Sequence, residues 1–397
     1  MKEGWRYCRL GDICRIERGG SPRPIKQFIT HSEDGLNWIK IGDTDPQGKY
    51  IYSTREKIKK EGLNKSRWVE ENEFLLSNSM SFGRPYILKT NGCIHDGWLV
   101  LRDYQNSLFI DFFYYMLISP VVQKQFRTKA QGSTVSNLNT DRVSNVNVSF
   151  PTIDEQQRIV EYLDKAFEYV DLLKDNSQKQ LDEARKLFQA ALTEAMQPKE
   201  GWETKKIKDI SDIKGGKRVP KGYKLLSTKT EHPYIRVSDF TDNGSVDLTN
   251  ILYISDDIYQ QIKNYTITDN DIYISIAGTI GKSGIIPSSL NGANLTENAC
   301  KIVFKAPIER RYFYLFTLSD VFKKQIEKAT KQASQPKLAL TRLAEVEIYL
   351  PSIAEQVEIV QKLDALSDNV QKLEEINRKV IVECDALKQS ILRQIFE

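Results

Sequence analysis

The sequence predicts an α+β protein built as a tandem repeat, in which two globular mixed α/β domains are joined by two long helices that form an antiparallel coiled coil with pseudo-two-fold symmetry. The segment Phe-Pro-Thr-Ile-Asp-Glu-Gln at 150–156 returns as Leu-Pro-Ser-Ile-Ala-Glu-Gln at 350–356, and the offset of 200 residues then holds to the last residue. The openings of the halves also match, because Glu3-Gly4-Trp5 recurs as Glu200-Gly201-Trp202 and Gly19-Gly20 as Gly215-Gly216. A repeat of this length indicates two domains rather than a short-period solenoid.

This duplication divides the 397 residues into four segments. A first globular domain covers 1–151 and is followed by a central long helix at 152–197. A second globular domain covers 198–351 and is followed by a C-terminal long helix at 352–397. Shared scaffolds with divergent loops, such as 77–84 against 275–282, are typical of two binding domains with different targets.

Both long helices carry start signals and a heptad pattern. Thr152 with Glu155, and Ser352 with Glu355, fit the capping box, and a proline precedes each. Apolar residues then follow at steps of four and three: Ile159, Leu163, Ala166, Val170, Leu173, Leu181, Ala184, Phe188, Ala191 and Ala195, and Ile359, Leu363, Leu366, Val370, Leu373, Val380, Cys384, Leu387 and Ile391. This is the seam of a coiled coil, and an antiparallel pairing of helices about 65 Å long fits the connectivity. Ser177 and Asn377 continue the series, so the seam is expected to carry one polar layer.

Short β-branched and aromatic runs predict the strands of the globular halves. In the first half they are Trp38–Ile41, Glu73–Leu76, Trp98–Leu101 and Val146–Phe150, and in the second half Tyr234–Val237, Asp271–Ile276, Ala299–Phe304 and Val346–Leu350. One apolar helix is predicted in each half, near Phe109–Phe126 and Arg310–Ile326.

Composition excludes several classes of protein. There is no apolar run long enough to cross a bilayer and no charged-then-apolar leader, so we expect no membrane association. Five cysteines without a CxxC pair favour a reduced, cytoplasmic chain, and three histidines without ligand spacing argue against a metal site.

The net charge of +4 is unevenly distributed. The helical segments 152–197 and 352–397 carry −4 and −3, which leaves +11 on the globular parts. A basic excess on the compact domains favours a polyanionic partner, although ordinary solubilising lysines are the alternative.

The sequence lacks the complete motifs of two classes of enzyme. Gly278-Thr-Ile-Gly-Lys-Ser resembles the end of a phosphate-binding P-loop, but the first glycine of that motif would fall on Ile276. We therefore interpret the segment as a basic turn after a strand. No Asn/Asp-Pro-Pro-aromatic motif for adenine methylation occurs, which argues against a self-sufficient methyltransferase.

The order of variable domain, long helix, variable domain and long helix, with these motifs, resembles the specificity (S) subunit of type I restriction–modification systems. The resemblance rests on Phe150-Pro-x-x-x-Glu155-Gln156 and its repeat at 350–356, on Gly19-Gly20-Ser21-Pro22 and Gly215-Gly216-x-x-x-Pro220-Lys221-Gly222, and on Asp269-x-Asp271-Ile-Tyr-Ile-Ser275-x-Ala-Gly278-x-x-Gly281. It spans the whole chain. The first half departs from it at 77–84, which contains Gly83 but no counterpart of Gly278.

The resemblance implies that each globular half is a target-recognition domain that reads one part of a bipartite site in double-stranded DNA. It implies that the helices set the gap and dock two modification (methyltransferase) subunits, which carry S-adenosylmethionine, and that a separate motor–nuclease restriction subunit cuts. No catalytic residue and no cofactor are then expected in this chain. The alternative is a coiled-coil adaptor that binds proteins without sequence-specific DNA recognition.

Candidate DNA contacts are polar or basic loop residues that follow strands or glycines, since such side chains reach phosphates and base edges. In the first half these are Gly19, Gly20, Ser21, Arg23, Lys26, Asn78, Ser79, Arg84, Lys129, Gln131, Ser133 and Thr134, and in the second half Gly215, Gly216, Lys217, Arg218, Lys221, Thr279, Lys282, Lys331, Gln332, Gln335 and Lys337.

Overall fold

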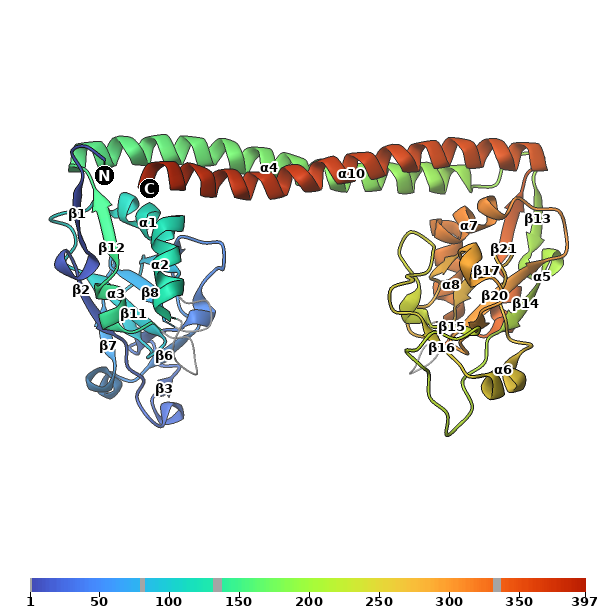
Figure 1. Cartoon of the computed structure of the whole chain (residues 1–397), viewed down its shortest axis with the longest axis horizontal. Helices are drawn as coiled ribbons and strands as arrows, with labels where there is room; N and C mark the ends of the chain where they lie inside the picture. The colour runs from blue at the N-terminus through green and yellow to red at the C-terminus, as the bar shows by residue number, and fades with distance from the viewer. Residues whose placement is uncertain (1, 79–82, 131–137, 331–336) are drawn as a thin grey trace. The chain divides into compact units, whose positions relative to one another are not determined.

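The computed structural model describes residues 2–78, 83–130, 138–330 and 337–397 (Figure 1). It divides into two compact units. The first unit comprises residues 1–178 with 378–397, and the second comprises 179–377. Each unit therefore contains one globular domain together with a stretch of both long helices.

The first unit is built on three sheets. The central sheet has the strand order β2(Arg15–Arg18)-β11(Trp98–Arg102)-β8(Phe74–Ser77)-β9(Pro85–Leu88)-β5(Tyr50–Ile51). The second sheet has the order β3(Ile29–Thr30)-β6(Glu56–Ile58)-β4(Leu36–Ile39)-β10(Gly92–Ile94)-β7(Arg67–Val69), in which β4 and β10 run parallel. The short β1(Arg6–Arg9) pairs antiparallel with β12(Asn147–Phe150).

The second unit repeats this framework with fewer strands. Its sheets have the orders β14(Ser211–Gly215)-β20(Ala299–Phe304)-β17(Ile272–Ser275)-β18(Ser283–Gly284), β16(Leu252–Tyr253)-β15(Pro233–Ile235)-β19(Asn294–Leu295) and β13(Glu203–Lys206)-β21(Glu347–Leu350). The parallel pair recurs as β15 and β19. All eight predicted strands are confirmed to within two residues at either end.

The prediction of one apolar helix in each half is wrong, because the helix is interrupted by a serine. The first unit has α1(Ile110–Ile118) and α2(Pro120–Ala130), and the second has α7(Arg310–Leu318) and α8(Asp320–Thr330). Ser119 and Ser319 have extended backbones, with ψ of 146° and 157°. Each serine hydroxyl donates to a carbonyl of the helix before it and accepts from the N–H of Val122 or Phe322 after it. The serine thus ends one helix and caps the next, as capping side chains do.

Four short helices complete the domains: α3(Thr140–Ser144), α5(Ile207–Ile210), α6(Asp256–Ile262) and α9(Leu340–Ala344). At the place that α6 occupies in the second unit, the first unit has a 3₁₀ turn at Lys60–Lys65.

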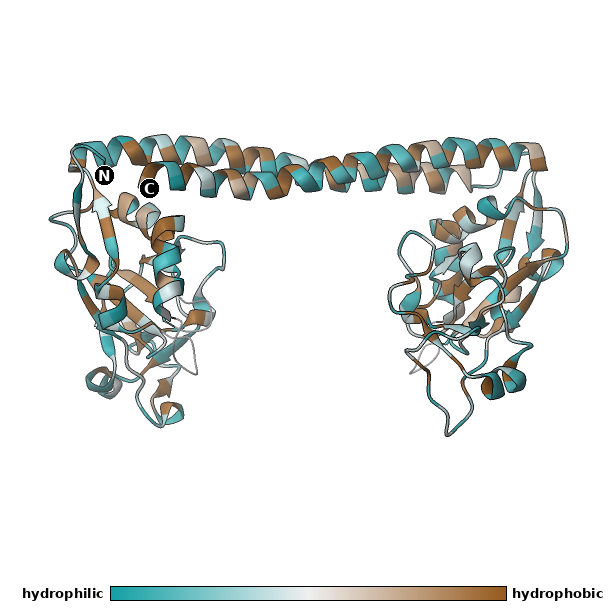
Figure 2. Ribbon diagram, viewed as in Figure 1, coloured by the Kyte–Doolittle hydropathy of each residue, from teal (hydrophilic) through white to brown (hydrophobic). Residues whose placement is uncertain are grey.

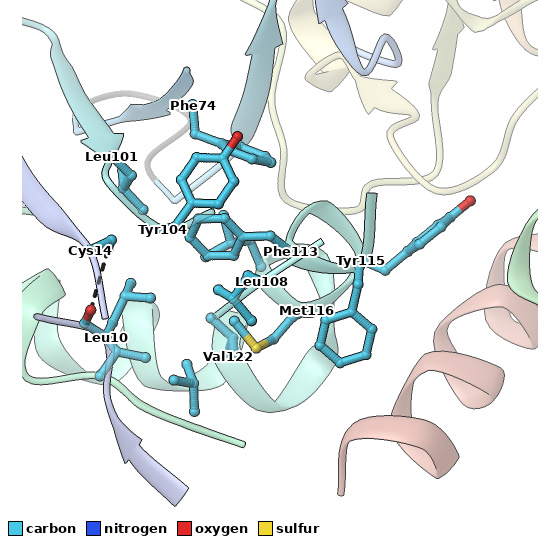
Figure 3. Packing of buried hydrophobic residues seen from close by; sticks show 14 of the residues in the cluster. Leu10, Cys14, Phe74, Leu101, Tyr104, Leu108, Phe113, Tyr115, Met116 and Val122 are labelled. Carbon is cyan, nitrogen blue, oxygen red and sulfur yellow. Dashed lines mark hydrogen bonds between the residues drawn. The ribbon is translucent and has the colours of Figure 1, made fainter. Parts of the chain in front are cut away.

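An aromatic cluster forms the centre of the first core (Figure 3). The rings of Phe74, Tyr104 and Phe113 are fully or almost fully buried, and their centroids lie 4.7–5.3 Å apart in tilted and edge-on arrangements. Such pairs add about 0.5–1.5 kcal/mol each beyond the burial of their surface.

The two long helices, α4(Ile153–Ala195) and α10(Ile353–Phe396), run antiparallel as predicted. In the first unit the beginning of α4 and the end of α10 share one core, through Leu163 and Leu392. In the second unit the end of α4 and the beginning of α10 do so, through Leu192 and Leu363. Because these leucines belong to the domain cores, each helix pair is anchored to the domain beneath it.

The Pro-x-x-x-Glu-Gln signature has a structural cause. Gln156 and Gln356 are buried, and their side-chain oxygens accept the N–H of Phe109 and Glu309 at the start of α1 and α7. Their amide groups donate to the carbonyls of Pro151 and Pro351. Each glutamine therefore fixes the start of a long helix to the start of α1 or α7 in its own domain.

The predicted cap of α10 forms in part. The Ser352 hydroxyl accepts the N–H of Glu355 at 3.3 Å, as a capping box requires. The Glu355 carboxylate, however, accepts the indole N–H of Trp202 at 3.1 Å, and so links the helix to the beginning of the second domain.

The seam differs from the prediction at three leucines. Leu173, Leu373 and Leu387 are 47–51% exposed. The buried residues Leu163, Val170, Ser177 and Ala184 of α4 form a heptad, and Leu181 between the last two is buried as predicted. At the place of each exposed leucine, the partly buried residue is instead the next one along the helix, the charged Lys174, Glu374 or Lys388. A four-three pattern read from apolar residues alone misses charged residues that enter a seam as ion pairs.

Both polar residues predicted for the seam are buried. Ser177 and Asn377 are each only 4% exposed. The Asn377 side-chain amide donates to the carbonyl of Leu373 on its own helix at 2.9 Å. Buried polar side chains in a coiled coil lower stability and fix the register.

Candidate nucleic-acid interface

Four segments of the first unit meet at the turn between β10 and β11. Gly19 donates its backbone N–H to the carbonyl of Trp98 at 2.9 Å, and Asn78 donates to that of Gly97 at 3.0 Å. Leu138 in turn donates to the carbonyl of Asn78 at 3.0 Å. These bonds join the loop after β2, the loop after β8, the turn itself and the chain before α3. We call this set, the described residues 19–23, 77–78, 83–84, 95–97 and 138, the first loop cluster.

The second unit repeats these bonds at equivalent places. Gly216 donates to the carbonyl of Ala299 at 3.0 Å, Ile276 to that of Asn298 at 2.8 Å, and Leu338 to that of Ile276 at 2.8 Å. We call residues 216–218, 275–282, 296–298 and 337–338 the second loop cluster. Segments far apart in the sequence therefore meet in the same way twice.

The hydrogen bonds correct the alignment of the glycine pairs. Gly19 matches Gly216 rather than Gly215, since both bond the first residue of the strand opposite, and Gly20 matches Lys217, since both donate to the last residue of the parallel strand. The offset here is 197 residues, the same as between Gly4 and Gly201. The adjacent glycines of the second half had shifted the sequence alignment by one residue.

Packing within each cluster explains the matched glycines. A Cβ on Gly19 would lie 2.2 Å from the carbonyl oxygen of His95, and one on Gly216 would lie 2.1 Å from that of Thr296. We predicted these glycines for close approach to DNA phosphates. The structure gives them a role inside the protein, because the backbone of their own turn fills the space.

An acidic residue at the turn organises each cluster. Asp96 accepts the Ser21 hydroxyl at 2.6 Å and the Arg23 guanidinium at 3.3 Å, and the hydrogen bond from Ser21 lowers the pKa of Asp96. The equivalent Glu297 accepts Arg218. Burial raises the pKa of Glu297, but the hydrogen bonds from Arg218 and its neighbours outweigh burial and leave the pKa lowered. Both acids escaped the sequence analysis because we sought only groups that attract phosphate.

The turn after β8 and the turn after β17 are equivalent, as predicted for Arg84 and Lys282. Ser77 exchanges backbone and side-chain hydrogen bonds with Arg84, and Ser275 does the same with Lys282. The guanidinium of Arg84 lies 5.5 Å from the centre of the Tyr86 ring, whereas Lys282 forms an ion pair of 2.7 Å with Asp242. That ion pair lowers the pKa of Asp242. Gly278 and Gly281, in the P-loop-like segment, have φ of +77° and +87° and belong to this turn.

The other candidates have varied positions. Asn78 is 1% exposed and its side-chain amide donates to the carbonyl of Asp96, so it holds the turn. Lys217, Lys221, Thr279 and Lys337 are exposed. Lys26 is exposed in the 3₁₀ turn Ile25–Gln27, and Lys129 is half-buried near the end of α2. The remaining candidates lie outside the described residues: Ser79, Gln131, Ser133, Thr134, Lys331, Gln332 and Gln335.

Two features are absent among the residues that the structure describes. Within them, no three His, Cys, Asp or Glu side chains are placed to bind a metal ion together. No helix in the described part of the chain has the length and apolar character required to span a bilayer.

Comparison with known proteins decides the family. The model of the type I restriction modification DNA specificity domain matches the chain twice, over residues 2–183 and 199–381. The chain belongs to this family. The two matches coincide with the two halves of the repeat, and the resemblance drawn from the helix motifs is confirmed.

Relatives and solved structures agree with this assignment over the full length. The chain is 27% identical to the EcoBI specificity subunit of Escherichia coli, over all of this chain and 86% of that one. It is 22% identical to the MjaVIII specificity subunit of Methanocaldococcus jannaschii, over 99% and 92%. The HsdS subunit of Thermoanaerobacter tengcongensis has the same fold, with a TM-score of 0.62 at 19% identity over 100% and 97% of the chains. A chain from a study of complex assembly and conformational transition of the type I R-M system has a TM-score of 0.80, also at 19% identity, over 99% and 97%.

Proposed function

We propose that the two loop clusters each read one part of a bipartite site in double-stranded DNA, as the specificity component of a type I restriction–modification complex. The observation that supports this most strongly is the repeated cluster itself, in which one backbone frame carries different side chains. Arg84 is matched by Lys282, and Gly20 by the exposed Lys217. A conserved frame with divergent side chains suits two recognition surfaces of different sequence preference.

The charges of each cluster suit a DNA partner. Arg23 and Arg218 are 77–80% exposed at the side chain, and each is held over the turn by one carboxylate. An arginine oriented in this way can present its remaining N–H groups to phosphate or to a guanine edge. An adaptor for proteins would not need the same basic group at the same turn of both domains.

We propose that the helix pair sets the gap between the two parts of the site. Inserting one heptad after Lys179 in α4 and one after Lys379 in α10 adds about 10 Å while preserving the seam. At about 3.4 Å per base pair, the preferred gap should grow by about three base pairs. Sequencing the methylated sites of cells that carry the complete system would show this change. Unchanged half-sites with an unchanged gap would contradict the proposal, and altered half-sites would show instead that the domains were disturbed.

We also propose that the helix pair docks two modification subunits at equivalent places. Leu173 and Leu387, beside the cross-helix contacts of the first unit, are about half exposed. The same repeat positions in the second unit, Leu373 and Leu187, are 47% and 59% exposed. The duplication of these exposed leucines on helices that already have a partner supports contacts with two copies of one further protein. Figure 2 shows hydrophobic and hydrophilic residues alternating along both long helices.

A test changes the two leucines of one unit at a time. Changing Leu173 and Leu387 to lysine should reduce the bound modification subunits from two to one, because charged side chains resist burial in an interface. Changing Leu187 and Leu373 should do the same, and changing all four should leave none. Native mass spectrometry of the reconstituted complex measures the ratio. Changing Tyr162 and Val382, which are also exposed on these helices, is the matched control. Retention of both subunits by the fourfold variant would place the docking site elsewhere.

On this proposal the chemistry resides in the partners. The modification subunits bind S-adenosylmethionine and methylate adenine, a motor–nuclease subunit cuts, and this chain contributes recognition without a cofactor of its own. The described cysteines are all free thiols, which fits a reducing cytoplasmic location.

A further inference from the structure

Two cross-helix ion pairs occupy equivalent positions of the repeat with their charges reversed. In the first unit, Lys174 Nζ of α4 lies 2.7 and 2.9 Å from the carboxylate oxygens of Asp385 of α10. In the second unit, Arg185 of α4 lies 2.7 Å from Glu374 of α10. An offset of 200 residues converts 174 into 374 and 185 into 385. In both of these pairs the basic partner comes from α4 and the acidic partner from α10.

We propose that this arrangement makes the seam selective, so that α4 pairs with α10 and rejects a second α4, while α10 rejects a second α10. Because positions 200 residues apart are equivalent, two α4 helices set antiparallel in the same register would place Lys174 opposite Arg185, twice. Two α10 helices would place Glu374 opposite Asp385, twice. Both of these attractive ion pairs would therefore be replaced by repulsive contacts between like charges. Coiled coils commonly choose partners by charges beside the seam.

A third ion pair acts in the same direction. Lys388 of α10 bonds Asp171 of α4, and its ammonium group also lies 5.0 Å from the centre of the Phe167 ring. The equivalent positions 188 and 371 hold phenylalanine and glutamine. A pair of identical helices would therefore place Asp171 opposite a phenylalanine, or Lys388 opposite a glutamine, and neither can replace the ion pair.

The consequence concerns the whole chain. The apolar seam positions of α4 and α10 are alike, so the seam alone would let two copies of the chain pair their like helices and associate as a dimer. The charges work against that dimer and favour the pairing of α4 with α10. This inference does not depend on what the loop clusters bind.

The experiment uses two full-length variants with the net charge of the natural chain. The exchange variant, Lys174→Glu with Glu374→Lys, makes the α4–α10 contacts repulsive and the contacts between like helices attractive. The inversion variant adds Arg185→Asp and Asp385→Arg, which makes the α4–α10 contacts attractive again with all signs reversed. Analytical ultracentrifugation measures the dimer dissociation constant of each variant and of the natural chain.

The exchange variant should dimerise at least about 10-fold more tightly than the inversion variant, which should resemble the natural chain. The difference should vanish near 1 M salt, where charges are screened beyond about 3 Å. The neutral variant, Lys174→Gln with Glu374→Gln, should be intermediate, and it replaces the exchange variant if the latter does not fold. Equal dissociation constants for the natural chain and all folded variants at low salt would overturn the proposal.

Discussion

Replacing Gly216 with alanine should disrupt the second loop cluster and abolish recognition of the half-site that this cluster reads. The new Cβ would lie 2.1 Å from the carbonyl oxygen of Thr296 and 2.4 Å from that of Leu295. Both contacts are with backbone, and the Leu295 carbonyl already accepts the N–H of Lys217. The turn cannot retreat without breaking these bonds, so we expect a loss of about 3 kcal/mol or more in the free energy of unfolding of this unit.

The neighbouring glycine provides a matched control. A Cβ on Gly215 would approach no closer than 3.5 Å, to the Leu340 side chain. Because alanine suits a strand better than glycine, Gly215→Ala should change stability by no more than about 1 kcal/mol and leave DNA binding intact. Urea unfolding and binding to duplexes altered in either half-site measure both effects. Similar losses for the two variants would show that the close approach at Gly216 does not determine the structure of the cluster.

Most of the fold could be predicted because its signals are local. The repeat, the strands and the helix starts each depend on short patterns. Gln156 and Gln356 show why one such pattern recurs, since each accepts a backbone N–H at the start of α1 or α7. The break between α1 and α2 could not be predicted from the apolar pattern, because it depends on Ser119, whose hydroxyl bonds both helices. Lys174 and Glu374 were missed for a related reason. A charged residue can be predicted to lie in the seam only when its partner on the other helix is known.

The candidate site was predictable as a set of segments but not as a set of contacts. The glycine pairs and the loop after β8 were found in the sequence, and hydrogen bonds of their described residues join them to the turn between β10 and β11. The central turn with Asp96 was missed, because an acidic residue in a DNA-binding surface is recognisable only once the arginine that it orients is in place. The burial of Asn78 was not foreseen for the same reason, since it depends on that turn.

Changing Arg84 to alanine should weaken DNA binding through one half-site only. Arg84 belongs to the first loop cluster and Lys282 to the equivalent turn of the second, and each turn is closed by bonds within its own unit. If Arg84 contacts a phosphate, affinity should fall similarly for all sequences, and the slope of log affinity against log salt should drop by about one unit. If it reads a guanine, the loss should be about 1–3 kcal/mol and confined to one base pair.

Lys282→Ala should have the smaller effect of the two. Lys282 is already paired with Asp242, so contact with DNA must replace an existing ion pair, whereas Arg84 rests on the Tyr86 ring and keeps its charge available. A separate variant, Asp242→Asn in the otherwise natural chain, should tighten binding at the second half-site. Lys205→Ala, which removes an exposed lysine of β13, is the control for the lost charge. Binding of each variant to duplexes altered in one half-site at a time, at two salt concentrations, separates these outcomes. Equal loss of discrimination at both half-sites on Arg84→Ala would mean that the two clusters do not act independently.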